Sequence, residues 1–330
     1  MEDRKKDHID LAFQSRIEAS EANGHFFYEP LLAPHPSQRP QPFSFLGKSM
    51  RLPVWISSMT GGTALAGKIN RNLAQACAEF GLGMGLGSCR ILLEDDKYLP
   101  DFDVRPILGP DVPFYANLGI AQLESMIQKG NTDQIDELVY RLQADGLIIH
   151  VNPLQEVFQP EGDLLAVAPI ETIQAFLAQT QLKVIVKEVG QGMGPESLKA
   201  LLKLPIQAIE FGALGGTNFT KLELARHTKT DTELFDTFGH VGHSAEEMAA
   251  MVNQIVRESP DQRCGQLIIS GGITNVLDGY RLVKGSQLPA VFGMGSAFLK
   301  HAREDYSTLQ TFVKQIEKSL LLADHFLKVR

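Results

Sequence analysis

The sequence predicts a (β/α)8 barrel preceded by an amino-terminal arm. Eight short apolar segments alternate with helical patterns, and eight such units over about 250 residues are typical of this barrel. The apolar segments are continuous rather than alternating, as expected for parallel strands covered by helices. A doubly wound open sheet is the competing fold, but it favours fewer strands and a nucleotide-binding fingerprint after the first.

The first 50 residues are expected to form an arm packed on the barrel. Residues 4–21 have a helical pattern, because apolar side chains recur every four residues at Ile9, Phe13 and Ile17. A proline-rich stretch at 30–42 follows and excludes a regular helix there. Residues 51–330 then form the barrel, so we expect one domain overall.

The predicted strands are apolar runs bounded by turn-forming residues. In chain order they are Pro53–Ser57, Gly81–Gly87, Pro113–Gly119, Gly146–His150, Lys183–Gly190, Ile206–Gly212, Gln266–Gly272 and Ala290–Gly295. Helical periodicity fills most of the intervals. The predicted helices are Lys68–Phe80, Thr132–Gln143, Pro169–Gln179, Pro195–Leu202, Ser244–Val256, a short helix near Tyr280, and a stretch from Phe298 towards Leu327.

Composition limits the possible partners and the compartment. The chain has 31 basic and 39 acidic residues, a net charge of −8, which argues against a nucleic-acid binder. Cys77, Cys89 and Cys264 share no metal-ligand spacing, so reduced thiols are expected. The polar start is unlike a signal peptide, and no apolar run approaches the roughly 18 residues of a spanning helix. We expect a cytoplasmic protein with no membrane partner.

Polar and glycine-rich residues follow every predicted strand. The strand ends read SSMTGG, GSCR, NLG, HVNPLQE, KEVGQGMG, FGALGGTNF, SGGI and GMGS. In a barrel these ends meet at one mouth, where the active sites of the fold lie. The sequence therefore predicts a site at the mouth.

The last two strand ends indicate a phosphate site. Glycines in 270–273 and 293–296 let backbone N–H groups approach an anion closely. Barrels commonly bind phosphate after strands seven and eight. The alternative is that these glycines only form tight turns.

Four polar residues near strands four and five are candidates for chemistry. Lys187 ends an apolar strand and would hold a cation at the mouth. The alternative is an ion pair with Glu188 or another carboxylate, although neighbouring strand residues face opposite ways. Glu156 could be a general base or a Mg²⁺ ligand, or simply a helix-start residue. His150 could act at the site or be a hydrogen-bonded core residue. Gln155 cannot titrate near neutral pH, so it must orient or bind a partner.

Several motifs together resemble the type 2 isopentenyl diphosphate isomerases, which are FMN-dependent (β/α)8 enzymes. They are RKKDHI, SMTGG, GSCR, NLG, HVNPLQE, VKEVGQGMG, GALGGTNF and SGGI, in family order from Arg4 to about Leu299. HVNPLQE and VKEVG are the specific motifs, whereas SGGI and its glycines occur in many FMN barrels.

The resemblance implies a role for each matching residue. Residues that would line the flavin ring are Met59, Thr60, Gly61, Ser88 and Asn117, with Lys187 near its pyrimidine edge. Residues that would hold the ribityl phosphate are Thr217, Gly271, Gly272, Gly295 and Ser296. Substrate would contact Arg4, Lys5, Arg90, His150, Asn152 and Gln155, and Mg²⁺ would bind Glu156. The catalytic set would be Gln155, His150 and Lys187. Taken alone, the basic cluster of the arm is more typical of a solvated surface.

The family reaction interconverts isopentenyl and dimethylallyl diphosphate in isoprenoid biosynthesis. The resemblance implies that reduced FMN carries the acid–base chemistry, that NADPH serves only to reduce the flavin, and that Mg²⁺ neutralises the diphosphate. It also implies a homo-oligomer, a tetramer or octamer. One alternative is a 2-hydroxy-acid oxidase or dehydrogenase, which needs a histidine base and an arginine near the late strands. Another is a barrel without activity, which would need no polar mouth.

Three features depart from the family pattern. Cys89 stands within GSCR, so a reactive thiol is possible there. Ser296 occupies a phosphate-loop position where many members have arginine. The segment 226–243 matches no pattern; His240 and His243 within it are possible ligands, but a flexible loop is the simpler interpretation.

Overall fold

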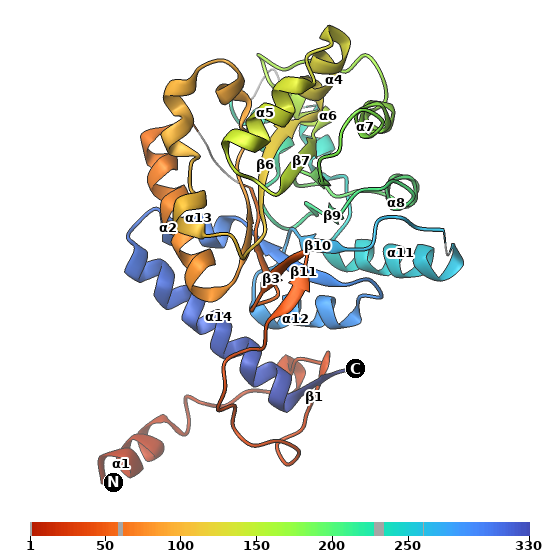
Figure 1. Cartoon of the computed structure of the whole chain (residues 1–330). Helices are drawn as coiled ribbons and strands as arrows, with labels where there is room; N and C mark the ends of the chain where they lie inside the picture. The colour runs from red at the N-terminus through yellow and green to blue at the C-terminus, as the bar shows by residue number, and fades with distance from the viewer. Residues whose placement is uncertain (1, 59–61, 228–233, 260) are drawn as a thin grey trace.

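The computed structural model describes residues 2–58, 62–227, 234–259 and 261–330. Eight parallel strands close into a barrel in chain order, with β11 pairing back to β4 (Figure 1). The strands are β4 (Val54–Ile56), β5 (Gly83–Gly85), β6 (Phe114–Gly119), β7 (Gly146–Val151), β8 (Val184–Glu188), β9 (Ala208–Glu210), β10 (Leu267–Ser270) and β11 (Ala290–Met294). Each coincides with a predicted strand, so the predicted fold class is confirmed.

Helices surround the barrel. They are α2 (Ala64–Phe80), α3 (Arg105–Leu108), α4 (Ile120–Lys129), α5 (Asp133–Arg141), α6 (Pro153–Phe158), α7 (Pro169–Leu177), α8 (Pro195–Leu202), α9 (Phe219–Leu224), α11 (Ala245–Glu258), α12 (Val276–Gly285), α13 (Ser296–Ala302) and α14 (Tyr306–Phe326). The prediction of a single carboxy-terminal helix from Phe298 is wrong, because a non-helical turn separates α13 from α14. Asp305 caps α14 by accepting a hydrogen bond from the Thr308 N–H at 2.8 Å.

Local sequence determines where α2 begins and ends. Thr63 Oγ1 accepts the Ala66 N–H at 3.1 Å and so satisfies one of the unpaired donors of the first turn. The helix ends at Gly81, whose φ of +69° is left-handed, a conformation that glycine adopts without steric cost. A Cβ there would lie 2.9 Å from the Arg51 backbone nitrogen. The strand that follows, β5, can therefore start immediately after the turn.

The barrel interior has a lower, apolar layer. It consists of one inward-facing residue from each of seven strands: Trp55, Tyr115, Ile148, Ile185, Ala208, Ile268 and Val291. These side chains form one buried cluster with Phe45, Leu46 and Met50, which come from the hairpin β2 (Phe43–Phe45) and β3 (Lys48–Met50). The hairpin therefore closes the amino-terminal end of the barrel with apolar side chains.

A second interior layer lies nearer the mouth and is mostly polar. Residues two positions apart on a strand face the same side, so the next inward residues on these strands are Ser57, Asn117, His150, Lys187, Glu210, Ser270 and Gly293. We call this set the mouth layer. Within it, His150 pairs with Lys187, and Lys187 with Glu210, in the register of neighbouring strands.

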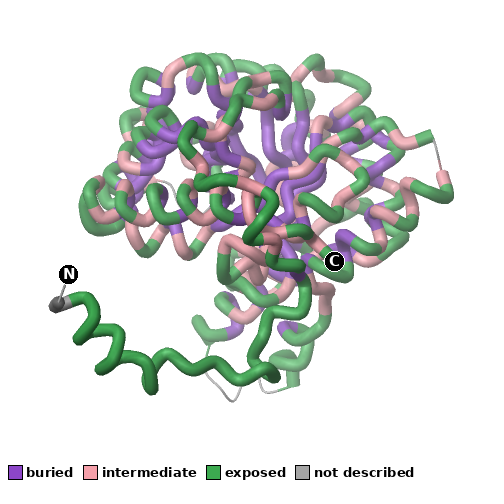
Figure 2. Tube along the Cα trace, turned by 90° about the horizontal axis from the view of Figure 1, so that it is seen from below, coloured by how far each residue is buried: buried purple, intermediate pink, exposed green. Residues whose placement is uncertain are grey.

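The amino-terminal arm extends away from the barrel (Figures 1 and 2). Its helix α1 runs from Glu2 to Leu11, and residues 4–25 are all exposed. The predicted helix to Glu21 is wrong beyond Leu11, apart from a 3₁₀ turn at Ala19–Glu21. Most helical stability in proteins comes from packing an apolar face, and the apolar side chains Ile9, Phe13 and Ile17 remain 70–78% exposed.

The carboxy-terminal strand pairs with a short strand of the amino-terminal arm. β1 (Phe26–Tyr28) pairs antiparallel with β12 (Leu327–Val329) directly after α14.

Among the described residues, no helix is long and apolar enough to cross a membrane.

Candidate active site

A cavity of about 420 Å³ opens at the mouth beside β8–β11. Six residues predicted to bind the cofactor line it together: Lys187, Thr217, Gly271, Gly272, Gly295 and Ser296. Its charged lining residues are Lys187 and Lys300, and no aspartate or glutamate belongs to the described lining. The cavity therefore favours an anionic ligand.

Two glycines of this cavity are also required by the fold. Gly271 has a φ of +92°, and a Cβ there would lie 2.1 Å from the Ala213 carbonyl oxygen. Gly272 has a φ of +70°, and its Cβ would lie 2.7 Å from the Leu214 oxygen. The tight-turn interpretation thus holds for these residues, and it is compatible with their position in the cavity wall.

Lys187 is buried, with 7% of its surface exposed, and its ammonium belongs to the barrel interior. Its Nζ donates to the backbone oxygen of Glu188 at 2.8 Å. The Glu188 carboxylate instead accepts three backbone N–H groups of the loop 190–192 at 2.6–2.8 Å. Burial raises the pKa of Glu188, and these hydrogen bonds oppose that rise. The Lys187 and Glu188 side chains therefore do not form an ion pair with each other.

His150 is oriented by a chain of hydrogen bonds. The Asn117 Nδ2 donates to the Leu86 oxygen at 2.9 Å, which leaves Asn117 Oδ1 to accept from His150 Nδ1 at 2.8 Å. Nε2 then carries the lone pair of the neutral ring. Burial, together with the nearby Lys187 ammonium, lowers the pKa of His150 to about 3. The ring is therefore an uncharged hydrogen-bonding group at neutral pH.

Glu156 lies in the first turn of α6 and is 6% exposed. Its Oε1 accepts from Asn152 Nδ2 at 2.8 Å, and its Oε2 accepts the Asp163 N–H at 2.9 Å. Pro153 occupies the first helical position, as expected for a helix start. No group of three or more histidine, cysteine or acidic side chains that could hold a metal ion occurs among the described residues. A metal at Glu156 would therefore take its other oxygens from water or a ligand.

Gln155 contacts an acidic residue that the sequence did not single out. Its Nε2 lies 3.3 Å from Oε1 of Glu223, which is 4% exposed and belongs to α9. Glu223 also accepts a hydrogen bond from Arg226 at 2.6 Å. The available signal was the acid six residues after Thr217, but the short helix that positions it was not predicted.

Arg90 connects the end of β5 to α6. Its Nη1 lies 3.2 Å from Asp163 Oδ2, and the Asp163 backbone N–H in turn contacts Glu156. Ser88 is exposed beside it, and its Oγ accepts the Arg90 N–H at 3.4 Å. Between them Cys89 is fully buried, and burial raises the pKa of its thiol to about 12. A reactive thiolate at Cys89 is therefore disfavoured.

Some predicted site residues are not brought to the mouth. Arg4 and Lys5 lie on the exposed helix α1 of the arm. Residues 59–61, which are Met59, Thr60 and Gly61, lie outside the described residues. His240 belongs to a short 3₁₀ helix, η4 (Asp236–His240). Its Nε2 contacts Asp236 of the same turn and Lys221 of α9.

Glu210 is a second residue that sequence reasoning missed. It is completely buried in the mouth layer beside Lys187, and neither carboxylate oxygen has a hydrogen-bond partner among the described residues. Burial raises its pKa, although Lys187 and the hydroxyls of Ser57 and Ser270 act in the opposite direction. The sequence feature that could have identified it is a glutamate near the end of an apolar strand, the same kind of position that Lys187 occupies.

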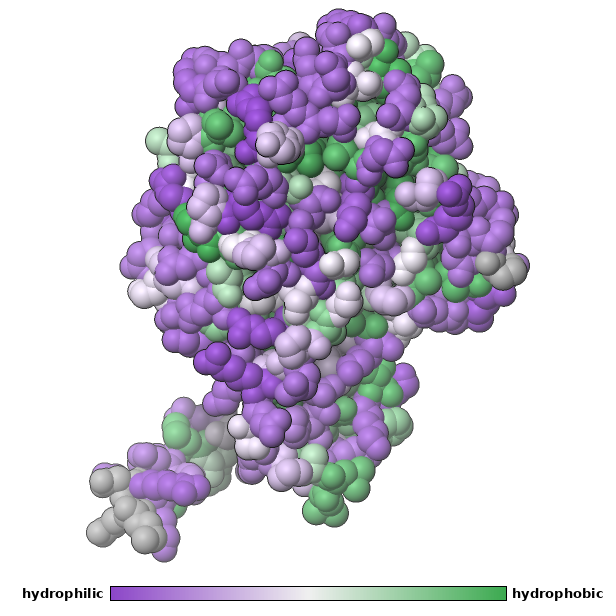
Figure 3. All heavy atoms as spheres, in the orientation of Figure 1, coloured by the Kyte–Doolittle hydropathy of each residue, from purple (hydrophilic) through white to green (hydrophobic). Residues whose placement is uncertain are grey.

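A larger cavity of about 630 Å³ lies between α7 and α8, outside the barrel wall. It is mainly apolar, and Figure 3 shows hydrophobic surface in this region. Its polar lining includes Asn152 and Gln155, which were predicted to contact substrate, as well as Gln191 and Glu188. All four make hydrogen bonds within the protein, and Glu188 and Glu196 add acidic groups to the lining. The smaller cavity at the mouth is therefore the better anion site.

No protein-family model matches the chain. The isopentenyl-diphosphate delta-isomerase of Rickettsia peacockii is 32% identical over 329 residues, covering 97% of this chain and 92% of that enzyme. The isopentenyl-diphosphate delta-isomerase of a Synechococcus species is 34% identical over 320 residues, covering 95% of this chain and 88% of that enzyme. The chain belongs to the isopentenyl-diphosphate delta-isomerases. The family resemblance read from the motifs is thereby confirmed.

Solved structures support the barrel fold of this chain. A flavocytochrome b2 variant aligns with a TM-score of 0.60 at 12% identity, covering 90% of this chain and 71% of that one. A mandelate oxidase variant aligns with a TM-score of 0.59 at 13% identity, covering 93% and 86%. At this identity the likeness establishes the barrel alone.

Proposed function

We propose that the mouth binds FMN, Mg²⁺ and isopentenyl diphosphate and interconverts this substrate with dimethylallyl diphosphate, with NADPH required only to reduce the flavin. The observation that carries the proposal is the change from an apolar to a polar layer inside the barrel, next to a cavity whose charged lining residues are two lysines. A chain of this family needs such a site for a diphosphate substrate.

The glycine-lined cavity fits FMN in size and charge. Its volume of about 420 Å³ lies within the roughly 300–1,000 Å³ of small-ligand sites. A mandelate oxidase with the same fold was solved with an FMN adduct. Asn117 and Ser88, with residues 59–61, would line the ring, and Lys187 would lie at its pyrimidine edge. The phosphate would bind among Thr217, Gly271, Gly272, Gly295 and Ser296. When bound in reduced form, FMN would supply the acid–base chemistry.

The side chains of the mouth would bind and orient the substrate. His150 is neutral, so its Nε2 can accept a hydrogen bond without adding charge near the alkene. Gln155 cannot titrate, and its contact with Glu223 fixes the direction of its amide. Lys187 would hold a positive charge next to an anionic cofactor. These residues would thus set the position of the double bond, which is where proximity lowers the barrier.

Glu156 would hold Mg²⁺ together with the diphosphate. Mg²⁺ usually keeps several waters and binds through one or two carboxylates plus substrate phosphates. A single buried carboxylate, already oriented by Asn152 and the Asp163 N–H, fits that arrangement. Arg90 would contact the same diphosphate, because Asp163 connects it to Glu156.

Arg4 and Lys5 would reach a diphosphate only if the arm packs against a mouth. The exposed apolar residues Ile9, Phe13 and Ile17 support packing of the arm in an oligomer, which we propose to be a tetramer or octamer. We also propose a cytoplasmic location, in keeping with three free, buried cysteines.

An anaerobic assay with isopentenyl diphosphate, FMN, NADPH and Mg²⁺ tests the function. We expect dimethylallyl diphosphate to accumulate to equilibrium while only a catalytic amount of NADPH is consumed. A complete reaction mixture that yields no dimethylallyl product would rule out the proposed activity. Oxygen-dependent oxidation of 2-hydroxy acids would instead support the oxidase alternative.

A further inference from the structure

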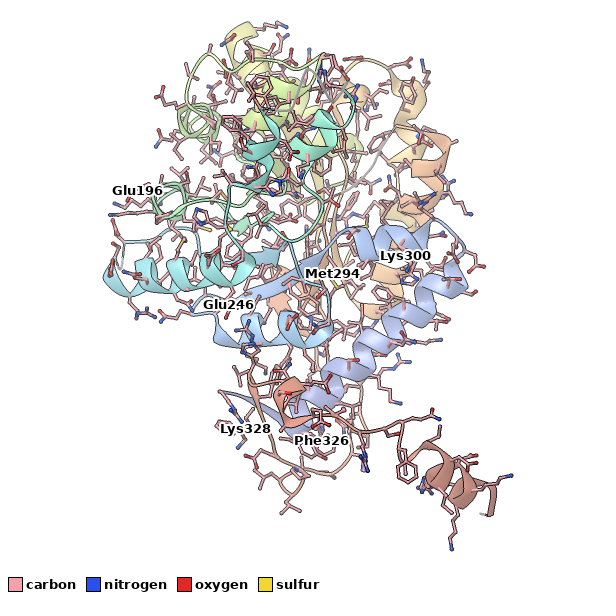
Figure 4. All side chains as sticks on the ribbon, turned by 180° about the vertical axis from the view of Figure 1, so that it is seen from behind. Glu196, Glu246, Met294, Lys300, Phe326 and Lys328 are labelled. Atoms are coloured by element: carbon pink, nitrogen blue, oxygen red, sulfur yellow. The ribbon has the colours of Figure 1, made fainter. Side chains whose placement is uncertain are left out.

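Positive charge is placed at two different levels of the mouth cavity. Lys187 belongs to the buried mouth layer inside the barrel. Lys300 lies on α13, is exposed, and lines the same cavity from outside the barrel wall (Figure 4). Since no acidic residue belongs to the described lining, a ligand would meet one cation at its inner part and another at its outer part.

The helical position of Lys300 directs it towards the phosphate loop. Ser296 is the first residue of α13, and Lys300 follows four residues later, so the two lie on the same helical face. Long side chains on a helix point back towards its amino terminus. The Lys300 ammonium is therefore carried towards Gly295 and Ser296, which line the cavity with it.

Lys300 has no competing role in the described parts of the chain. No aspartate or glutamate there lies within 4 Å of its Nζ, whereas Lys284, on the neighbouring α12, pairs with Asp324 at 2.9 Å. With no carboxylate partner and no acidic cavity neighbour among the described residues, this exposed lysine can bind a phosphate without first breaking an ion pair.

We propose that Lys300 binds the phosphate of FMN and, with Lys187 at the opposite level of the cavity, determines which way round the cofactor enters. This inference rests on the proposed binding of FMN. The group that Lys300 would bind is a phosphate monoester. The diphosphate of the substrate is the other phosphate source, and the experiment distinguishes the two.

The test compares FMN with riboflavin, which lacks the phosphate, by flavin fluorescence titration of the full-length protein. For Lys300→Gln we expect the dissociation constant of FMN to rise roughly tenfold, the value of one charge-assisted hydrogen bond, while that of riboflavin stays unchanged. Lys318→Gln, a matched change of an exposed lysine on α14, should alter neither. The FMN effect should shrink at high salt, because the lysine is exposed.

Three outcomes would contradict the inference. An unchanged FMN affinity in Lys300→Gln, or an equal loss for FMN and riboflavin, would show that Lys300 does not bind the phosphate. A raised KM for isopentenyl diphosphate at saturating FMN, without a change in FMN affinity, would assign the lysine to the substrate instead. A wild-type protein that binds neither flavin would overturn the proposed function itself.

A second variant tests whether a cation elsewhere on the same face of α13 can replace Lys300. A recovery of affinity in this variant would also show that the Lys300→Gln protein is folded. Adding Ser296→Arg to Lys300→Gln places a long cation one turn earlier on the same face. We expect FMN affinity to recover towards the wild-type value with no change for riboflavin. No recovery would contradict the claim that the cation, rather than the lysine's packing, binds the phosphate.

Discussion

The two interior layers of the barrel are built by the same strands and have opposite character. Ile148 and Ile185 in the lower layer are completely buried among apolar side chains and the hairpin β2–β3. Two residues further along the same strands stand His150 and Lys187. Strand alternation places both pairs inside the barrel, so position along the strand separates a stabilising residue from a functional one.

The mouth layer is costly to the fold. The Glu210 carboxylate and the Ser57 hydroxyl are buried without hydrogen-bond partners among the described residues. In the lower layer the Trp55 Nε1 and the Tyr115 hydroxyl are also unpaired there, but they sit on otherwise apolar rings and carry no charge. Burying unpaired polar groups opposes folding, and proteins keep such violations mainly at functional sites. The lower layer contributes the compensating stability, so substitutions in the two layers should have separable effects.

The largest expected effect is on stability, in the lower layer. Ile148→Ala removes a completely buried side chain from the interior cluster, and such truncations cost about 2–5 kcal/mol in the free energy of unfolding. Denaturant unfolding measures this loss. Turnover per folded molecule should stay close to that of wild type; a loss of turnover as large as that at the mouth would break the distinction between the layers.

Lys187→Met should show the reverse pattern. Removing a charge that acts on the developing transition state typically reduces kcat by about a hundredfold, and the buried methionine should cost the fold little. Anaerobic kinetics and denaturant unfolding of the same sample measure both. Ile185→Val, on the same strand, is the control: it should lose about 1 kcal/mol of stability and no turnover. An active Lys187→Met enzyme would count against a role for this cation.

Glu156→Gln should raise the Mg²⁺ concentration needed for half-maximal turnover by roughly tenfold, since metal ligation is lost while the shape is kept. Titration of the isomerase rate with Mg²⁺ measures the shift. Glu161→Gln serves as the control, because Glu161 is exposed and pairs with Arg226 instead. Identical Mg²⁺ dependence in wild type and Glu156→Gln would remove Glu156 from the metal site.

The smallest effect concerns pH. The pKa of His150 falls from 6.5 in the unfolded chain to about 3 in the folded protein, so the unfolded state binds more protons between these values. Stability contributed by the neutral ring is therefore complete above pH 6.5 and is lost as pH falls towards 3. Between pH 6.5 and 5.5 the loss should be about 1 kcal/mol. His150→Asn should flatten this part of the curve; an unchanged slope would show that the ring titrates normally.

The sequence predicted the features of the barrel that depend on local residue patterns. Continuous apolar runs identified all eight barrel strands, and strand alternation separated Lys187 from Glu188. The hairpin β2–β3 and the pairing of β1 with β12 were not predicted, because these short strands depend on contacts distant in sequence. Glu223 was missed because α9, the short helix that positions it, was not predicted. Lys300 lies within the helical stretch predicted from Phe298, but periodicity does not show that this helix lines the cavity.

The central claim is that the mouth positions the substrate, while the cofactor rather than the polypeptide supplies the acid–base chemistry. The most direct measurement is the anaerobic isomerisation rate of the flavin-stripped protein with Mg²⁺ and NADPH, before and after FMN is added back. We expect no dimethylallyl diphosphate without FMN and recovery of the full rate when FMN saturates the site. Isomerisation at an undiminished rate in the stripped protein would contradict it.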